Sequence, residues 1–180
     1  ALSHCFESIW NKNANPTSTD YAIKGICSVL INAPILKENP SDVRIRKNLL
    51  KASNQAGLAF SNTKTAAAHS ISYPLTIYYG IPHGIASSIS LIPLLEINKN
   101  FITEQINKIC EKIQLTFDQL KQRISSIYQG IIPFTLESWD VPKSQLEFLL
   151  KHSFTKDRME NNIINLKKSD IKNILNKIYE

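Results

Sequence analysis

Residues 41–60, SDVRIRKNLLKASNQAGLAF, carry the pattern that decides the fold class. Apolar side chains recur there at helical spacing, at Val43, Ile45, Leu49, Leu50, Ala52 and Ala56. Ser41 is a favourable residue for capping the N-terminus of such a helix. The pattern therefore predicts a helix that begins after Ser41 and continues through Gly57 toward Phe60.

Helices are also expected before this segment. Residues 2–13 form an amphipathic stretch, and Asn15-Pro16 ends it because Pro16 suits the first turn of a new helix. We expect that second helix to run to about Asn32. Pro34 and the pair Asn39-Pro40 then predict a loop, since proline removes a backbone donor.

The rest of the chain continues the helical pattern. Ser61–Thr63 are expected to cap an Ala-rich helix, residues 80–84 predict a turn, and a very apolar, mostly buried helix is expected over 85–97. Amphipathic helices are predicted over 103–113, 116–129, 142–154 and 169–179, with Thr103, Thr116 and Ser169 as caps and Pro142 in a first turn.

Evidence for strands is weak along the whole chain. Only residues 73–79 gather β-branched and aromatic side chains, and Pro74 disfavours a strand there. The chain has 180 residues, of which 43% are hydrophobic and 20% charged, which is typical of a globular domain. We therefore predict an all-α, multi-helix bundle that forms one domain over residues 1–180.

Composition excludes several function classes. The net charge is +6, but the basic excess is spread evenly over both halves, so no nucleic-acid partner is expected. Prolines and histidines interrupt the longest uncharged stretch, 65–95, which argues against a membrane span, and no signal peptide is recognised. Three widely spaced cysteines predict neither a disulfide framework nor a Cys-type zinc site, and they favour a reducing, cytoplasmic location.

Glycine is scarce as well. The five glycines fit neither GxGxxG nor GxxxxGK[ST]. We therefore expect no phosphate-binding loop for a nucleotide within this chain.

Three of the four histidines lie in distinctive settings. His4 is on the first expected helix, His69 on the Ala-rich helix, and His83 follows the Gly-Ile-Pro turn. Imidazoles from separate helices can converge inside a bundle, and three nitrogen ligands with a carboxylate suit Zn²⁺ or Fe²⁺. Spacing alone leaves open that each is a buried or capping histidine.

Four blocks of sequence, taken together, are more specific. They are ALSHCFES at 1–8, GLAFSNT at 57–63, AHSISYPL at 68–75 and GIPHGIA at 80–86. In this order they resemble the helical C-terminal domain of the iron-containing (group III) alcohol dehydrogenases. The match is dense to about Asn98 and then thins, with Asp157-Arg158 and Asn161-Asn162 similar to a tail motif.

The resemblance implies roles for individual residues. His4, His69 and His83 would be three of four metal ligands, and the fourth, an Asp, would lie immediately before Ala1. The family's N-terminal α/β domain, which binds NAD or NADP, is expected to be absent from this chain. That missing domain is the expected partner, and a homo-oligomer is a second arrangement that would cover exposed apolar surface.

Three further residues are candidates for the same site. Tyr73 stands where many relatives have a second histidine, and it is either a hydroxyl directed into the site or a packed aromatic. Glu7, one turn from His4, is either a carboxylate that orients that imidazole or a surface residue. Lys64 and its neighbours look most like the phosphonoacetaldehyde reductase branch, so Lys64 is either an anion-binding residue or a solvent-exposed lysine.

The resemblance thus implies the metal-binding catalytic domain of an NAD(P)-dependent alcohol dehydrogenase or aldehyde reductase. A divalent metal, Fe²⁺ or Zn²⁺, would polarise the substrate oxygen during hydride transfer, and a phosphonate-bearing aldehyde is a candidate substrate. We expect the isolated chain to be inactive. Two alternatives are a non-enzymatic helical remnant or scaffold, and a metal-dependent hydrolase of unrelated activity.

Overall fold

The computed structural model describes residues 1–180 and contains helices joined by turns, without strands. An isolated backbone bridge between Asn11 and Asn162 is its sole β-type pairing. The prediction of an all-α fold is therefore confirmed. None of the helices combines the length and the apolar character that crossing a bilayer requires.

The α-helices are α1 (Leu2–Ile9), α2 (Pro16–Glu38), α3 (Val43–Thr63), α4 (Ala67–Tyr79), α5 (His83–Ala86), α6 (Leu91–Asn98), α7 (Thr103–Ile113), α8 (Phe117–Tyr128), α9 (Leu146–His152) and α10 (Lys168–Lys177). Four short 3-10 turns are η1 (Lys99–Phe101), η2 (Glu137–Trp139), η3 (Lys143–Gln145) and η4 (Met159–Asn161).

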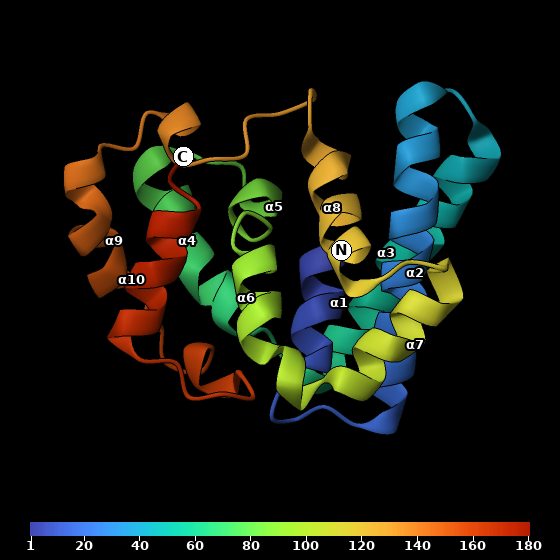
Figure 1. The fold of residues 1–180 in the computed structure, drawn as a ribbon, viewed down its shortest axis with the longest axis horizontal. Coiled ribbons are helices and arrows are strands. Elements are labelled where there is room, and N and C mark those ends of the chain that lie inside the picture. Colours follow the sequence, from blue (N-terminus) through green and yellow to red (C-terminus); the bar gives the residue numbers. More distant parts are fainter.

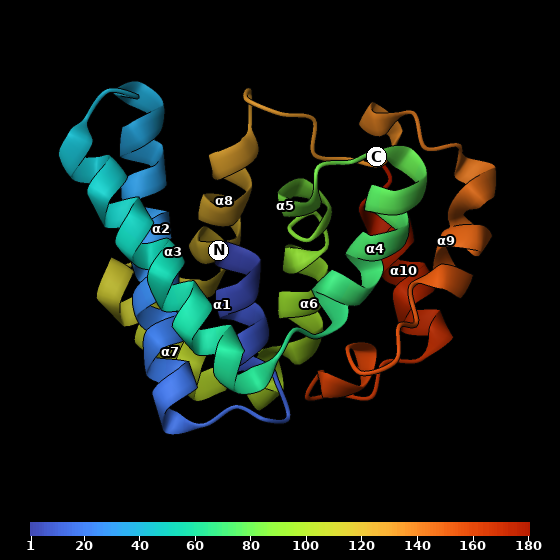
Figure 2. The ribbon, with the colours of Figure 1, turned by 180° about the vertical axis from the view of Figure 1, so that it is seen from behind.

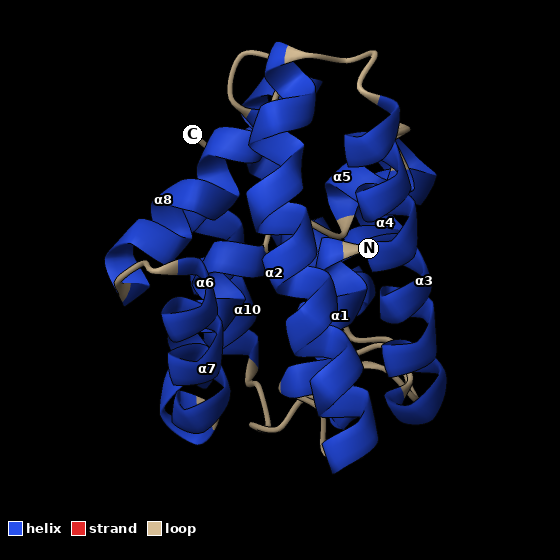
Figure 3. Cartoon of the chain, turned by 90° about the vertical axis from the view of Figure 1, so that its right-hand side faces the viewer, coloured by secondary structure: helices blue, strands red, loops and turns tan.

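The helices form two groups on either side of α1, α5 and α6. The long hairpin of α2 and α3 lies on one side with α7, and α4, α9 and α10 lie on the other (Figure 1). The reverse view shows the same arrangement (Figure 2), and the side view shows loops as the only non-helical parts (Figure 3). Helix α1 packs against α2, α3, α4 and α6, so its side chains lie at the centre of the molecule.

A single hydrophobic core runs through both groups. Phe6 of α1 and Trp10, which directly follows that helix, are among its largest fully buried side chains, and their rings stack at 5.5 Å. Helix α2 approaches α1 most closely at Gly25, where an added Cβ would lie 2.5 Å from the Cys5 Sγ. That contact allows α1 to lie in the groove between α2 and α3.

The prediction of a loop at Pro34 is wrong, because α2 continues through this residue to Glu38. A proline inside a helix leaves the carbonyl four residues earlier without its usual donor. Here the Leu30 carbonyl accepts a bond of 3.2 Å from the Arg123 guanidinium on α8. A contact between distant helices therefore compensates the break that the local sequence predicts.

The prediction of a single apolar helix over 85–97 is also wrong, because a turn at Ser87–Ser90 divides this segment into α5 and α6. The Ser88 hydroxyl bonds the Gly84 carbonyl at 2.7 Å and the Ser3 hydroxyl at 2.9 Å. Serine side chains of this kind compete with helical backbone bonding. The turn lets α5 point His83 toward α4.

Predicted caps are confirmed in part. Thr116 forms the capping box of α8 with Gln119, as expected. Asp42 rather than Ser41 caps α3, since its carboxylate accepts from two N–H groups of the first turn. Ser61–Thr63 form the last turn of α3 instead of capping α4, whose N-cap Ala66 has no capping side chain.

Replacing Gly25 with Ala should lower the free energy of unfolding by about 1–3 kcal/mol, because the new methyl group overlaps the buried Cys5 sulfur. Cys5→Ala removes that sulfur, so the double variant should lose less than the two single variants combined. Urea denaturation of the four proteins measures the coupling.

Gly57→Ala in α3 is the matched control. Nothing lies within 4 Å of a Cβ at Gly57, so alanine should stabilise the helix by up to about 1 kcal/mol through its higher helix propensity. Equal stabilities of the Gly25 and Gly57 variants would contradict the close approach of α1 and α2.

Candidate functional site

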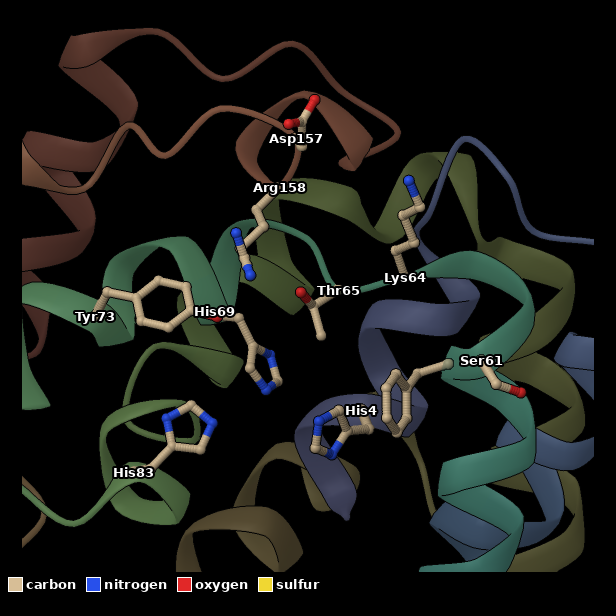
Figure 4. A pocket seen from close by; sticks show the side chains of 10 residues that line it. His4, Ser61, Lys64, Thr65, His69, Tyr73, His83, Asp157 and Arg158 are labelled. Atoms are coloured by element: carbon tan, nitrogen blue, oxygen red, sulfur yellow. The ribbon is translucent and has the colours of Figure 1, made fainter.

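One cavity of about 660 Å³ gathers most of the candidate residues. Its walls come from α1, α3, α4, α5 and the segment before η4, as Figure 4 shows. The lining residues are His4, Phe60, Ser61, Lys64, Thr65, His69, Tyr73, His83, Asp157 and Arg158.

The structure brings the three predicted histidines together in this cavity. The ring centroids of His4 and His69 are 4.5 Å apart, and those of His69 and His83 are 5.2 Å apart. The His4 ring also stacks on Phe60 at 4.3 Å. As the rings stand, no group of three or more His, Cys, Asp or Glu side chains is arranged to hold a metal ion. Shared ligation of one ion would require side chains in this group to turn from these positions.

Glu7 is fully buried and contacts His69, not His4 as the sequence predicted. One carboxylate oxygen accepts from the His69 backbone N–H at 3.0 Å, and the other contacts the ring Nδ1. Glu7 thereby supplies the cap that α4 lacks locally. The reading of Glu7 as a surface residue is wrong.

This pairing fixes how the His69 ring is used. Because a carboxylate can only accept, Nδ1 carries the hydrogen and the neutral ring keeps its lone pair on Nε2. The Nε2 atom is buried and has no hydrogen-bond partner. An unpaired lone pair inside a cavity, oriented by a carboxylate behind it, fits a metal ligand.

The other two rings also favour the neutral form. Burial, followed by the neighbouring His69, lowers the pKa of His4 to about 3. Partial burial and His69 likewise lower the pKa of His83. At neutral pH His4 and His83 are therefore uncharged, which is the form that donates to a metal ion.

Lys64 lies at the rim of the cavity with an exposed side chain. Figure 4 shows its ammonium group directed away from the three histidines. Its backbone has φ 65° and ψ 179°, a conformation that is almost restricted to glycine. Asn11 and Thr63 hold it there by donating to the Lys64 carbonyl at 3.3 and 3.0 Å.

Arg158 enters the cavity although the sequence gave no firm role for it. Its guanidinium lies 4.8 Å from the centre of the Tyr73 ring and points toward His69 (Figure 4). The similarity of residues 157–162 to a family tail motif was the one signal that could have indicated it. Tyr73 is half-buried and lines the cavity, with its ring centroid 6.3 Å from that of His83.

His152 lies outside this cavity and has structural contacts. Its Nδ1 bonds the Phe148 carbonyl at 2.8 Å, and its ring packs on Phe148 and Tyr78. A smaller cavity of about 320 Å³, next to the first, includes His152 and shares Tyr73 and Arg158 with it.

Comparison with known proteins identifies the family of the chain. The model of the Fe-containing alcohol dehydrogenase family, C-terminal, matches residues 1–179. The chain belongs to this family. Long-chain-alcohol dehydrogenase 1 of Geobacillus thermodenitrificans is 26% identical over 169 residues, which cover 88% of the chain and 43% of that protein.

Solved structures show the same fold. 1,3-Propanediol oxidoreductase has a TM-score of 0.86 at 23% identity, over 99% of this chain and 49% of its own. Sulfoacetaldehyde reductase from Bifidobacterium kashiwanohense, solved with NAD⁺, has a TM-score of 0.81 at 25% identity, over 98% and 47%. The chain thus spans about half the length of the relatives it matches.

Membership of this dehydrogenase family supports the oxidoreductase class for the chain. Relatives are named as iron-containing or NAD-dependent enzymes, which supports a metal and a nucleotide cofactor in general terms. The part of the relatives that the chain matches is their helical C-terminal half.

Glu7→Gln should change the His69 tautomer. The amide oxygen can still accept from the backbone N–H, but the amide nitrogen then faces Nδ1, which must accept in turn. The ring hydrogen moves to Nε2, and the ¹⁵N chemical shifts of the ring report that move. An unchanged tautomer would contradict the proposed control by Glu7.

The stability of the Glu7 variants provides the control. Glu7→Ala leaves the His69 donors buried without an acceptor, so it should cost about 3–5 kcal/mol. Glu7→Gln keeps one acceptor and should cost clearly less.

Lys64→Gly should raise the free energy of unfolding by about 1 kcal/mol, because glycine adopts this backbone conformation without the strain that lysine bears. Lys64→Ala keeps the strain and serves as the control, with no comparable gain expected. Thermal unfolding distinguishes them, and equal melting temperatures would rule out stored strain at this position.

Proposed function

We propose that the chain is the metal-binding catalytic part of an NAD(P)-dependent alcohol dehydrogenase or aldehyde reductase. The unpaired lone pair of His69 Nε2, buried between His4 and His83 and oriented by Glu7, supports this most strongly. His4, His69 and His83 would hold the metal, together with a carboxylate from the length of the protein that relatives have beyond this chain.

The chemistry divides between bound groups and this chain's own residues. When bound, a divalent ion (Fe²⁺ or Zn²⁺) supplies a Lewis acid for the substrate oxygen, and the nicotinamide supplies or accepts the hydride. The three imidazoles would provide the ligands, and an imidazole bound to a metal ion adds no charge. The cavity walls orient the carbonyl group for hydride transfer, and such orientation lowers the barrier by removing entropy before the reaction.

Tyr73 is the candidate for handling the substrate proton. Its half-buried side chain lines the cavity on α4, one helical turn after His69 and beside His83. We assign its hydroxyl to hydrogen-bonding the substrate oxygen and exchanging a proton with it. The Arg158 guanidinium lies over the Tyr73 ring at 4.8 Å and so holds the ring in place beside the histidines.

A negatively charged aldehyde is the substrate that the cavity favours. Lys64 and Arg158 line it, and Asp157 is the sole lining carboxylate. The sulfoacetaldehyde reductase relative is named for an aldehyde that bears a sulfonate. A phosphonate-bearing aldehyde carries a group of the same shape, and Lys64 at the rim is a candidate to attract it.

Binding of the nicotinamide cofactor needs a further domain. We place this NAD(P)-binding domain in the part of the protein that relatives have beyond this chain. The chain's partners are then a small aldehyde or alcohol and that domain, within the cytoplasm. Exposed apolar side chains such as Val43, Leu50 and Ile77 offer surface for the domain or for a second copy.

His83→Ala should weaken Zn²⁺ binding to the chain strongly, because it removes a metal ligand. The loss should exceed the roughly 10–100-fold caused by removing a residue that only hydrogen-bonds a ligand. His83 has an exposed side chain, so the variant should fold normally. Isothermal titration calorimetry measures the affinity. His152→Ala is the matched control and should bind as the unmodified chain does; equal weakening in both variants would exclude the three-histidine site.

The isolated chain should show no aldehyde-dependent oxidation of NADH or NADPH, because it lacks a phosphate-binding loop for the cofactor. Absorbance at the nicotinamide band measures the rate with Zn²⁺ or Fe²⁺ added. Joining the chain to the N-terminal domain of a family member should restore turnover. Turnover by the chain alone would overturn the assignment of the cofactor site to another domain.

A further inference from the structure

Arg158 is a cation without a carboxylate partner. None of the ion pairs of the structure involves it, and its guanidinium donates no hydrogen bond within the chain. Asp157 is its neighbour in sequence, but Figure 4 shows that carboxylate directed away from the guanidinium. Arg158 is half-buried and its nitrogen atoms are not among the buried atoms that lack a partner, so its free donors remain open to a ligand.

The segment that carries Arg158 is held firmly against α4 and the residues before it. The Asn161 amide donates to the carbonyls of Thr65 and Asp157, both at 2.8 Å. The Thr155 N–H donates to the Ser70 hydroxyl at 2.9 Å, and that hydroxyl donates to the Ser153 carbonyl at 2.5 Å. These bonds fix both sides of Arg158, so the guanidinium is placed before a ligand arrives.

Tyr73 fixes the orientation of the guanidinium itself. The cation lies over the ring face at 4.8 Å, a contact that holds the planar group while leaving its N–H edges free. A guanidinium held in this way can donate two parallel bonds to one oxyanion.

The other walls add donors but no competing anion. Lys64 and Thr65 line the cavity from the α3–α4 connection, on another side from Arg158, with the Lys64 ammonium at the rim (Figure 4). Glu7 lies behind His69 and is already bonded to it. Donors from two directions suit an anion whose oxygens are not coplanar, such as a phosphonate or sulfonate.

We propose that Arg158, held by Tyr73 and by the bonds of Asn161, is the specificity-determining residue that binds a tetrahedral oxyanion on the substrate. This inference rests on the proposed function only in placing the aldehyde end of the substrate at the histidines. Lys64 is the outer cation that attracts the anion, and Arg158 is the inner one that pairs with it.

Anion binding can be tested on the 180-residue chain without metal or nucleotide. The probe is methylphosphonate, titrated in the presence of a chelator and followed by the ¹H–¹⁵N spectrum of the chain, with acetate as the planar comparison. We expect saturable shifts around the cavity, tighter for methylphosphonate than for acetate. Arg158→Gln should weaken methylphosphonate binding by about tenfold or more, and Arg158→Lys by less, since lysine keeps the charge but not the paired donors.

Two charge-matched controls complete the design. Lys156→Gln removes the same charge two residues away, at an exposed side chain outside the cavity, and should leave the affinity within about twofold. Lys64→Gln should give an intermediate loss. Tyr73→Leu, which removes the ring under the guanidinium, should weaken binding while Tyr73→Phe should not.

The proposal is overturned if Arg158→Gln binds methylphosphonate as tightly as the unmodified chain does. It is also overturned if Arg158→Gln weakens methylphosphonate binding no more than Lys156→Gln does. Tighter Arg158-dependent binding of nicotinamide mononucleotide than of methylphosphonate would overturn the assignment to the substrate in favour of the cofactor. The titration measures anion binding and no turnover. Its failure is therefore distinguishable from failure of the proposed dehydrogenase function, which is tested by activity of the chain joined to an N-terminal domain.

Discussion

The contact between Glu7 and His69 connects the core to the cavity. A carboxylate with no exposure to solvent needs hydrogen-bond donors, and the first turn of α4 provides them through the His69 backbone and ring. The same contact caps α4, joins it to α1 and selects the ring nitrogen that faces the cavity. Removing it would therefore disturb the helix packing and the site together, which explains why a fully buried position of α1 carries an acidic residue.

The small residues around this contact make it possible. Ala66, Ala67 and Ala68 are fully buried, so the start of α4 lies close against α1 with little side-chain bulk between them. Gly25 has the equivalent effect on the other side of α1, beside Cys5. Helix α1 is thus enclosed on two sides by residues that are small for the same steric reason, and His4 and Glu7 project from it in fixed directions.

Local sequence signals predicted the helices well and the contacts between them poorly. Thr116 could be recognised as a cap because its partner lies three residues away, and the histidines could be selected because the four sequence blocks were recognised together. Pro34 was misread because the donor that satisfies Leu30 lies on α8. For the same reason Glu7 was paired with the wrong histidine: the partner one turn away was visible in the sequence, whereas the one 62 positions away was not.

Arg158 reaches the histidines through a segment whose position depends on Asn161, and Asn161 bonds a carbonyl 96 positions earlier in the chain. The residues of the histidine wall come before those of the arginine wall in the chain, so they leave the ribosome first. A nascent chain therefore completes the three imidazoles well before it completes the cation opposite them. The order of synthesis separates the two halves of the cavity in time, so a chain that stops short of residue 158 would display histidines in an open groove rather than in an enclosed site.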